Sequence, residues 1–231
     1  MDEKRLTDKL EIKNLKIEEQ ALAEFYDADT DVDKKHPVLD GSVLYTYEDY
    51  CTWDDEIRYE LIDGIPYVLS APLRKHEDIS GSLFYQLYGF LKGKPCKVYD
   101  APFDVRLDIR LKDERPLNEQ DDARFDTVVQ PDILVVCDKS KLDDKGCKGA
   151  PDLVMEILSP SSKRKDMLIK FNKYLQCGVR EYWIIDPESK VVTVNILDNG
   201  KYYSTSYEET DSVTVSVLDG FQMNLEDVFM A

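Results

Sequence analysis

The chain has 231 residues, with 47 acidic and 30 basic side chains, so its formal net charge at pH 7 is −17. This length suits one domain with a sizeable core, and 42% hydrophobic residues with 14 tyrosines exclude a disordered acidic protein. No apolar run approaches the roughly 18 residues of a membrane helix, and none follows the charged start. We therefore expect neither a membrane span nor a secretory signal.

The negative charge is concentrated toward the two ends of the sequence. Residues 1–60 carry 18 acidic and 8 basic residues, and residues 181–231 carry 10 and 2. Residues 61–180 carry 19 acidic and 20 basic residues, and the basic ones cluster at 71–97 and 160–180. These clusters indicate either solvated surface side chains or a basic rim that could hold a phosphate backbone. The overall charge therefore does not exclude a nucleic-acid partner.

The five cysteines include no C-x-x-C pair, so neither a zinc finger nor a thioredoxin-like site is indicated. Cys137 lies in the apolar run ILVVC, where we expect a small buried residue, and we expect a reducing, cytoplasmic location for the protein. The two histidines, His36 and His76, are too few for a histidine-rich metal site. Any metal would therefore be held by carboxylates, which suit hard cations such as Mg²⁺ or Mn²⁺.

The first residues differ in pattern from the rest of the chain. Residues 1–35 are highly charged and show only weak helical spacing. We expect an acidic helical extension over residues 1–40 and a main domain over residues 41–231.

Hydrophobic spacing and turn residues then predict the elements of the first half of the main domain. The segment YELI-DG-IPYV predicts a β-hairpin with a two-residue turn, and Gly93 is a plausible helix stop. The elements expected here are a short helix within 45–58, the hairpin at 59–68, a helix over 75–92, a strand over 97–107 and a loop over 108–127.

The second half alternates strands with one basic helix. Leu168, Phe171 and Leu175 are expected to form the apolar stripe of that helix, and Gly178 its stop. A strand–helix–strand unit of this kind favours parallel neighbouring strands. The expected elements are strands at 128–136, 153–158 and 181–185, a charged loop at 139–148, a helix over 163–176 and a hairpin over 191–207.

Two acidic residues stand in apolar strands, Asp132 in QPDILVVC and Glu156 in DLVMEILS. Asp152 shares a strand face with Glu156, but four residues of strand span about 13 Å, which is too far for one ion. Asp132 is the better partner because paired strands lie only about 4.8 Å apart. From the residues alone, both could equally be strand-end acids in water or in salt bridges.

Several of these motifs occur together in order: YELIDG, PFDVRL, QPDILVV, PDLVMEILSPSS and GVREYWIIDP. From about Tyr59 to about Tyr207 the sequence resembles the Uma-type restriction endonuclease family of the PD-(D/E)XK nuclease superfamily. The resemblance implies an α/β (α+β) fold with a restriction-endonuclease-like core, in which helices flank a mixed central β-sheet. To this core we expect the N-terminal helical extension and a C-terminal β-hairpin to be added.

The resemblance also implies metal-dependent cleavage of DNA by an endonuclease. It makes Asp132 and Glu156 the ligands of Mg²⁺ or Mn²⁺, and Glu60 a further acid near the metal. The superfamily motif Glu-x-Lys would place a lysine at residue 158, where this chain has Leu158. In this family the lysine comes from the following helix, where Lys170 is the best positional match.

Other interpretations of single residues stay open. Lys170 could instead be an exposed helical lysine paired with Asp166 at i−4. His76 could approach the site or be an ordinary helix-start histidine, and Asp104 could face the site or be an exposed strand acid. Weaker substitutes for the lysine are Lys163, Arg164 and Lys165, and three aromatic residues are expected in the core, namely Tyr174, Tyr182 and Trp183.

Two other functions and one assembly state also follow from the sequence. A catalytically inactive nuclease-fold protein that binds nucleic acid or a protein partner would explain Leu158 and the acidic flanks. A carboxylate-pair glycosidase has less support, since the acids come with a basic helix rather than an aromatic sugar cleft. By fold-level analogy with nucleases that cut both DNA strands, we expect a two-fold homodimer.

Overall fold

The computed structural model describes residues 36–53, 56–108, 125–160 and 165–230. The predicted helical extension falls almost wholly outside these ranges, as does most of the predicted loop over 108–127. No helix within the described ranges is long and apolar enough to cross a membrane.

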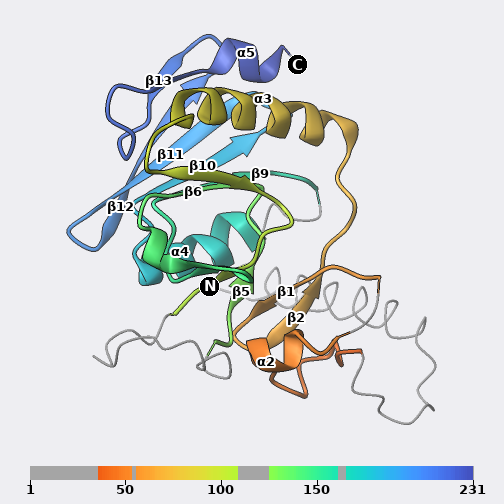
Figure 1. The fold of residues 1–231 in the computed structure, drawn as a ribbon. Coiled ribbons are helices and arrows are strands. Elements are labelled where there is room, and N and C mark those ends of the chain that lie inside the picture. The colour runs from red at the N-terminus through yellow and green to blue at the C-terminus, as the bar shows by residue number, and fades with distance from the viewer. Residues whose placement is uncertain (1–35, 54–55, 109–124, 161–164, 231) are drawn as a thin grey trace, which may run out of the picture.

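A mixed six-stranded sheet forms the centre of the protein (Figure 1), in the order β12-β11-β10-β9-β6-β3. β9 and β10 are parallel, as the strand–helix–strand pattern predicts, and the other pairs are antiparallel. The strands are β3 (Lys97–Asp100), β6 (Ile133–Val136), β9 (Leu153–Ile157), β10 (Glu181–Asp186), β11 (Val191–Asp198) and β12 (Lys201–Glu208). The predicted mixed central sheet is therefore confirmed.

A second, more irregular sheet has the order β2-β1-β5-β4-β8-β7. Its strands are β1 (Tyr59–Ile62), β2 (Ile65–Val68), β4 (Val105–Arg106), β5 (Val128–Val129), β7 (Leu142–Asp143) and β8 (Gly146–Lys148). The predicted charged loop over 139–148 is wrong, because it contains β7, β8 and the 3₁₀-helix η2 (Lys139–Lys141).

Two predicted long strands are each divided between the two sheets. The segment 97–107 forms β3 and then β4, and the segment 128–136 forms β5 and then β6. Pro102 lies in the first break and Pro131 in the second. Since proline has no N–H to donate to a strand ladder, each break falls where continued pairing would lose a hydrogen bond.

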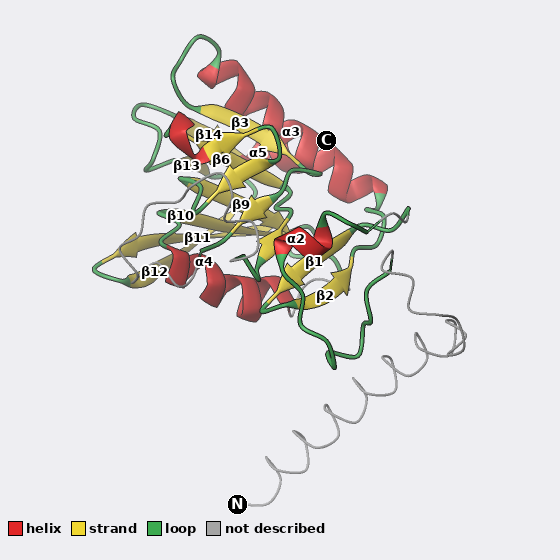
Figure 2. Ribbon diagram, turned by 60° about the horizontal axis from the view of Figure 1, so that its bottom comes forward, coloured by secondary structure: helices red, strands yellow, loops and turns green. Residues whose placement is uncertain are grey.

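Helices cover both faces of the central sheet (Figures 1 and 2). The long helix α3 (Arg74–Leu91) buries four apolar residues at helical spacing on one face, namely Ile79, Leu83, Leu87 and Leu91. The same core includes residues of β13 (Ser212–Thr214), β14 (Gln222–Asn224) and α5 (Leu225–Phe229), none of which the sequence predicted. On the other face lie the π-helix η3 (Lys165–Lys170) and α4 (Phe171–Cys177).

Both predicted hairpins are present, with two-residue turns. In the β1–β2 turn Asp63 and Gly64 have φ values of 52° and 79°, and in the β11–β12 turn Asn199 and Gly200 have 48° and 76°. Two successive positive φ values are typical of type I′ turns, which explains the Asp-Gly and Asn-Gly pairs. The predicted short helix is also present as α2 (Tyr47–Tyr50), which a Thr46–Asp49 capping box starts.

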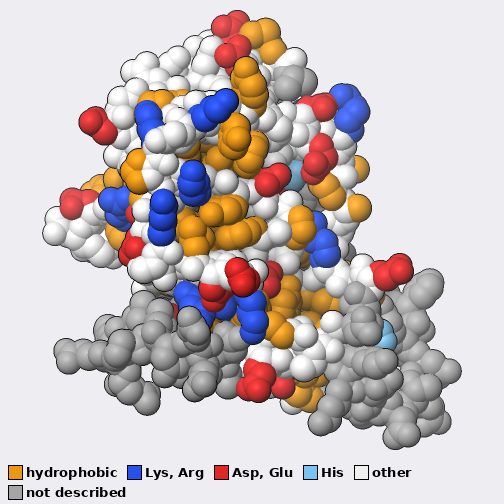
Figure 3. Space-filling view, in the orientation of Figure 1, with side chains coloured by type: hydrophobic (Ala, Val, Ile, Leu, Met, Phe, Trp, Pro, Cys, Tyr) orange, Lys and Arg blue, Asp and Glu red, His pale blue; other side chains and the backbone are white. Residues whose placement is uncertain are grey.

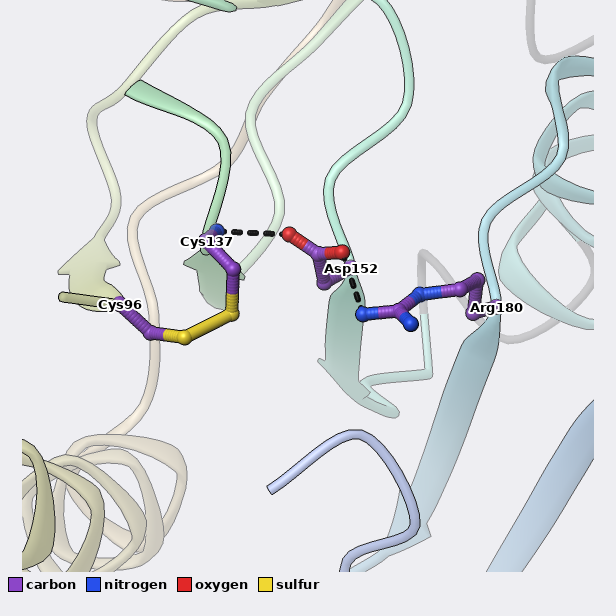
Figure 4. Close-up of a disulfide and its surroundings, with 4 residues drawn as sticks. All are labelled: Cys96, Cys137, Asp152 and Arg180. Atoms are coloured by element: carbon purple, nitrogen blue, oxygen red, sulfur yellow. Dashed lines mark hydrogen bonds and ion pairs between the residues drawn. A yellow bond between two sulfur atoms is a disulfide. The ribbon is translucent and has the colours of Figure 1, made fainter. Parts of the chain in front are cut away.

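A disulfide joins Cys96, just before β3, to Cys137, just after β6 (Figure 4). The prediction that Cys137 is a small buried hydrophobic residue is therefore wrong, because Cys137 is only partly buried and forms a disulfide. The pairing follows from topology, because Lys97 lies opposite Val136 in the β3–β6 ladder and the cysteines are the next residues outward. Sequence spacing could not reveal this, since 41 positions separate the two cysteines.

Candidate active site

Asp132 and Glu156 lie side by side at one end of the central sheet. In the β6–β9 ladder Ile133 is opposite Met155, so the next step outward brings Asp132 to Glu156. The backbone N–H of Ile157 donates to Asp132 Oδ2 at 2.7 Å, which holds the aspartate against β9. Asp152, at the opposite end of β9, takes no part in this pair. The structure thus gives Glu156 the neighbour that strand geometry predicts.

Lys170 is buried among carboxylates rather than exposed. Its Nζ lies 2.6 Å from Glu60 Oε1, 2.9 Å from Glu156 Oε1 and 3.4 Å from Asp166 Oδ1. Only 4% of the Lys170 side chain is exposed. The alternative of an exposed lysine is therefore wrong, although its predicted i−4 contact with Asp166 does exist. This cluster brings Glu60 together with three residues of the distant segment 156–170.

The segment that carries Lys170 presents a polar inner face. Asp166, Lys170 and Tyr174 are its buried residues, at intervals of four, and the Tyr174 hydroxyl donates to Glu156 Oε1 at 2.6 Å. The predicted apolar stripe is wrong for Leu168, which is 56% exposed. The predicted α-helix is also replaced by a π-helix up to Lys170, a conformation often found at functional sites.

Glu60, in β1, links this cluster to the second sheet. It is completely buried, and its two oxygens take different partners. Oε1 accepts from the backbone N–H of Gln130 at 3.0 Å and contacts Lys170, whereas Oε2 lies 2.8 Å from Lys165 Nζ. Burial alone would raise the pKa of Glu60, but the two ammonium groups outweigh it and lower that pKa. Glu60 is therefore an ionised anchor for both lysines.

Glu156 is the carboxylate that the cluster compensates least. Burial raises its pKa to about 8, and Asp166, Asp132 and Glu60 add to the rise, while Lys170 opposes it. Glu156, Glu60 and Asp166 in turn raise the pKa of Lys170 above its usual value despite burial. When ionised, the four carboxylates Glu60, Glu156, Asp166 and Asp132 exceed the ammonium groups of Lys165 and Lys170 by two charges, or by one when His76 beside Asp132 is protonated. This surplus suits a divalent cation.

The pair Asp132 and Glu156 has the donors that such a cation needs. The contacts of Asp132 with Ile157 and His76 both use Oδ2, and those of Glu156 with Lys170 and Tyr174 both use Oε1. Each carboxylate thus keeps a second oxygen outside these contacts. No group of three or more His, Cys, Asp and Glu suited to a metal occurs in the described ranges. Mg²⁺ commonly binds through only one or two carboxylates plus water and substrate phosphate, so the pair fits.

His76 does approach this pair. It lies in the first turn of α3, and its Nε2 is 3.2 Å from Asp132 Oδ2. Burial lowers the pKa of His76, but Asp132 and Glu77 outweigh burial and raise it. His76 therefore steadies the oxygen of Asp132 that also accepts from Ile157.

Asp104 lies farther out and supports Gln130. It accepts from Gln130 Nε2 at 2.9 Å and from the hydroxyls of Tyr47 and Tyr50 at 3.1 and 3.3 Å. Since the Gln130 backbone N–H donates to Glu60, Asp104 supports the cluster indirectly through Gln130. The alternative of a simple exposed strand acid is wrong, because Asp104 is hydrogen bonded within the fold.

Several residues of the predicted basic rim form ion pairs. On the face shown in Figure 3, basic and acidic side chains are interspersed rather than separated. Lys163 and Arg164 lie outside the described residues. The surface pairs formed by the rim are Arg74–Asp78, Lys75–Glu188, Lys173–Asp63 and Arg180–Asp152.

Sequence reasoning did not place Gln130 in the cluster, and it named Asp166 only as an i−4 partner of Lys170 and Tyr174 only as a core residue. Asp166 and Tyr174 were identifiable in principle, because D-x₃-K-x₃-Y puts three polar groups at intervals of four beside apolar residues. Gln130 acts through its backbone N–H, which no sequence pattern reveals.

Comparisons with known proteins bear on the family and the fold of the chain. The family model described as "Uma2: Putative restriction endonuclease" matches residues 45–226. An uncharacterized protein of Synechocystis sp., slr1290, is 25% identical over 168 residues, which cover 71% of this chain and 80% of that protein. A crystal structure titled as a putative nuclease belonging to DUF820, from Anabaena variabilis, superposes with a TM-score of 0.62 at 19% identity. The superposition covers 80% of this chain and 98% of the Anabaena chain, and shows a shared fold.

Proposed function

Since the chain belongs to the Uma2 family of restriction-endonuclease-like proteins, we propose that it is an endonuclease that hydrolyses DNA phosphodiester bonds with Mg²⁺ or Mn²⁺. One observation carries the proposal. Asp132 and Glu156 lie at adjacent ends of paired strands, and each keeps a carboxylate oxygen outside its internal contacts. A pair of this kind, with lysines beside it, suits the hydrolysis of a phosphodiester.

In this proposal Asp132 and Glu156 hold the cation. A bound divalent cation supplies an activated water and neutralises charge on the phosphate. The chain's own groups fix the two carboxylates, since Ile157 N–H and His76 orient Asp132 and Tyr174 O–H orients Glu156. Glu60 and Asp166 hold Lys170 in place, so the ligands are positioned before substrate arrives.

The test is cleavage of supercoiled plasmid with magnesium or manganese chloride. We expect the wild-type protein to nick or linearise plasmid, and Asp132→Asn and Glu156→Gln each to abolish the reaction. Asp152→Asn is the matched control, because it makes the same chemical change on the same strand as Glu156, about 13 Å away. Equal cleavage by all four proteins would refute the assignment of the site.

Manganese titration by calorimetry separates this function from that of an inactive nuclease-fold protein. We expect one Mn²⁺ per chain in the wild-type protein and none in Asp132→Asn. Binding that is missing, or that Asp132→Asn leaves unchanged, would favour the inactive alternative, which Leu158 at the usual lysine position motivates.

The homodimer belongs to the proposal as well. A single site cuts one strand at a time, and a two-fold pair of sites would cut both strands. Light scattering coupled to size-exclusion chromatography, with and without DNA, measures the assembly directly. A monomer under both conditions, combined with double-strand cleavage, would contradict the dimer.

A further inference from the structure

Carboxylates surround the ammonium group of Lys170. An ammonium group has three N–H groups. Three carboxylate oxygens lie within 3.4 Å of Lys170 Nζ, from Glu60, Glu156 and Asp166. The side chain is also almost wholly buried, as its exposed fraction is only 4%. To reach a phosphate, Lys170 would have to leave a buried carboxylate without its counter-charge, which is strongly unfavourable.

Lys165 is in a different situation on the same segment. Its Nζ has a single carboxylate, Glu60 Oε2 at 2.8 Å, as ion-pair partner among the described residues. Its side chain is 14% exposed, compared with 4% for Lys170. Lys165 therefore keeps N–H groups and solvent access for a second acceptor.

Glu60 also places Lys165 correctly for this role. Its carboxylate spans the two lysines, with Oε1 at Lys170 and Oε2 at Lys165. The Glu60 carboxylate therefore lies between Lys165 and Lys170, and Lys170 in turn contacts Glu156. Because Glu60 is buried and ionised, it fixes the position of the Lys165 ammonium group, and the Lys165 side chain is still 14% exposed.

We propose that Lys165, rather than Lys170, contacts the phosphodiester that is cleaved, and that Lys170 is a positioning residue for the carboxylates. The inference rests on the proposed function and assigns the cationic group that the Glu-x-Lys motif would otherwise supply at residue 158. A lysine contact of this kind stabilises negative charge as it develops on the phosphate.

The deciding measurement is the salt dependence of DNA binding. Anisotropy of a labelled DNA duplex is measured with calcium chloride between about 50 and 200 mM sodium chloride, and the same samples are checked for cleavage products. Each phosphate contact contributes about 0.9 to the slope of log K against log salt. We expect Lys165→Met to lower this slope by about one, and Lys170→Met to leave it unchanged.

Three further variants make the comparison strict. Lys201→Met removes an exposed lysine at the opposite end of the sheet and should leave slope and cleavage unchanged. Lys165→Arg keeps the positive charge and should keep the wild-type salt slope. Lys165→Gln keeps a polar side chain without the charge and should lower the slope by about one, as Lys165→Met does.

In manganese, Lys165→Met should lower kcat about 100-fold with unchanged Mn²⁺ affinity. Lys170→Met should instead weaken Mn²⁺ binding.

The outcomes separate this inference from the proposed function. If Lys170→Met lowers the salt slope of DNA binding and Lys165→Met leaves it unchanged, the inference is wrong and Lys170 is the residue that contacts the phosphate. DNA binding that depends on Lys165 without any cleavage would refute the nuclease and retain the contact. A wild-type protein that neither binds nor cleaves DNA would refute both.

Discussion

Strand β9 carries one acidic residue near each end, and the two ends are compensated in opposite ways. At one end both oxygens of Asp152 have a donor, with Cys137 N–H at 2.6 Å from Oδ2 and Arg180 at 2.6 Å from Oδ1 (Figure 4). At the other end Glu156 directs its contacts to one oxygen and lies among further carboxylates. One acid is matched by one cation, while the other belongs to a cluster with surplus negative charge.

The difference teaches how to separate a structural carboxylate from a candidate ligand. Asp152 and Glu156 lie on the same face of the strand and have the same charge when ionised, so neither hydrophobic periodicity nor composition distinguishes them. What distinguishes them is the balance of partners around each one. A buried surplus of negative charge is energetically costly, so such a surplus marks a candidate site for binding a cation.

The largest expected effect on stability lies at the Asp152 end, in the disulfide. Reduction, or the variant Cys96→Ser, opens the loop of 41 residues that the disulfide closes. In the chain-entropy model this should lower the free energy of unfolding by about 4 kcal/mol. Urea unfolding with and without reductant measures the change. Mn²⁺ affinity should not change, because the bond lies at the far end of the sheet. A loss of Mn²⁺ binding on reduction would show that the two ends are coupled.

Removal of the two acids should change stability in opposite directions. Asp152→Ala leaves the Cys137 N–H without its acceptor and should lower the unfolding free energy by about 2 kcal/mol. Above about pH 8, where Glu156 is ionised, Glu156→Gln removes a poorly compensated buried charge, so without metal it should melt at a higher temperature than the wild type. Thermal melts in EDTA measure both variants. Arg180→Ala is the control for Asp152, with a loss of under about 1 kcal/mol, since Arg180 is largely exposed. A lower melting temperature for Glu156→Gln would contradict the surplus of charge.

Much of the fold could be predicted because local rules decide it. The Asp-Gly and Asn-Gly turns, the apolar spacing of α3 and the parallel pair around the basic helix all follow from the sequence. Pro102 and Pro131 mark where the two long strands break, but which of the two sheets each half joins depends on tertiary pairing. The disulfide and the last elements of the chain depend likewise on tertiary pairing.

The candidate site was predictable as residue types rather than as a network. Asp132, Glu156, Lys170 and Glu60 follow from the family resemblance, and the structure brings all four together. Their partners did not follow, since a buried ion pair depends on the counter-charges that the fold assembles. Lys165 illustrates this, because its importance comes only from the second oxygen of Glu60.

The smallest expected effect is a dependence of metal binding on pH at the Glu156 end. With a pKa of about 8, Glu156 holds a proton at lower pH that a cation must displace. Mn²⁺ affinity should therefore rise about tenfold per pH unit up to about pH 8 and then level off. His76 also has a raised pKa beside Asp132, so His76→Gln is needed to isolate the contribution of Glu156.

The same proton fixes the sign of the stability change without metal. The folded state keeps the Glu156 proton up to about pH 8, whereas the unfolded chain releases it near pH 4.5, the ordinary value for a solvated glutamate. The folded state therefore binds more protons between these values, and the contribution of Glu156 to stability falls as pH rises. Calorimetric titrations and melts of the wild type, His76→Gln and Glu156→Gln across this range measure both slopes. A Glu156→Gln variant that kept the wild-type stability slope would place the proton on another group and remove the electrostatic contrast between the two ends of β9.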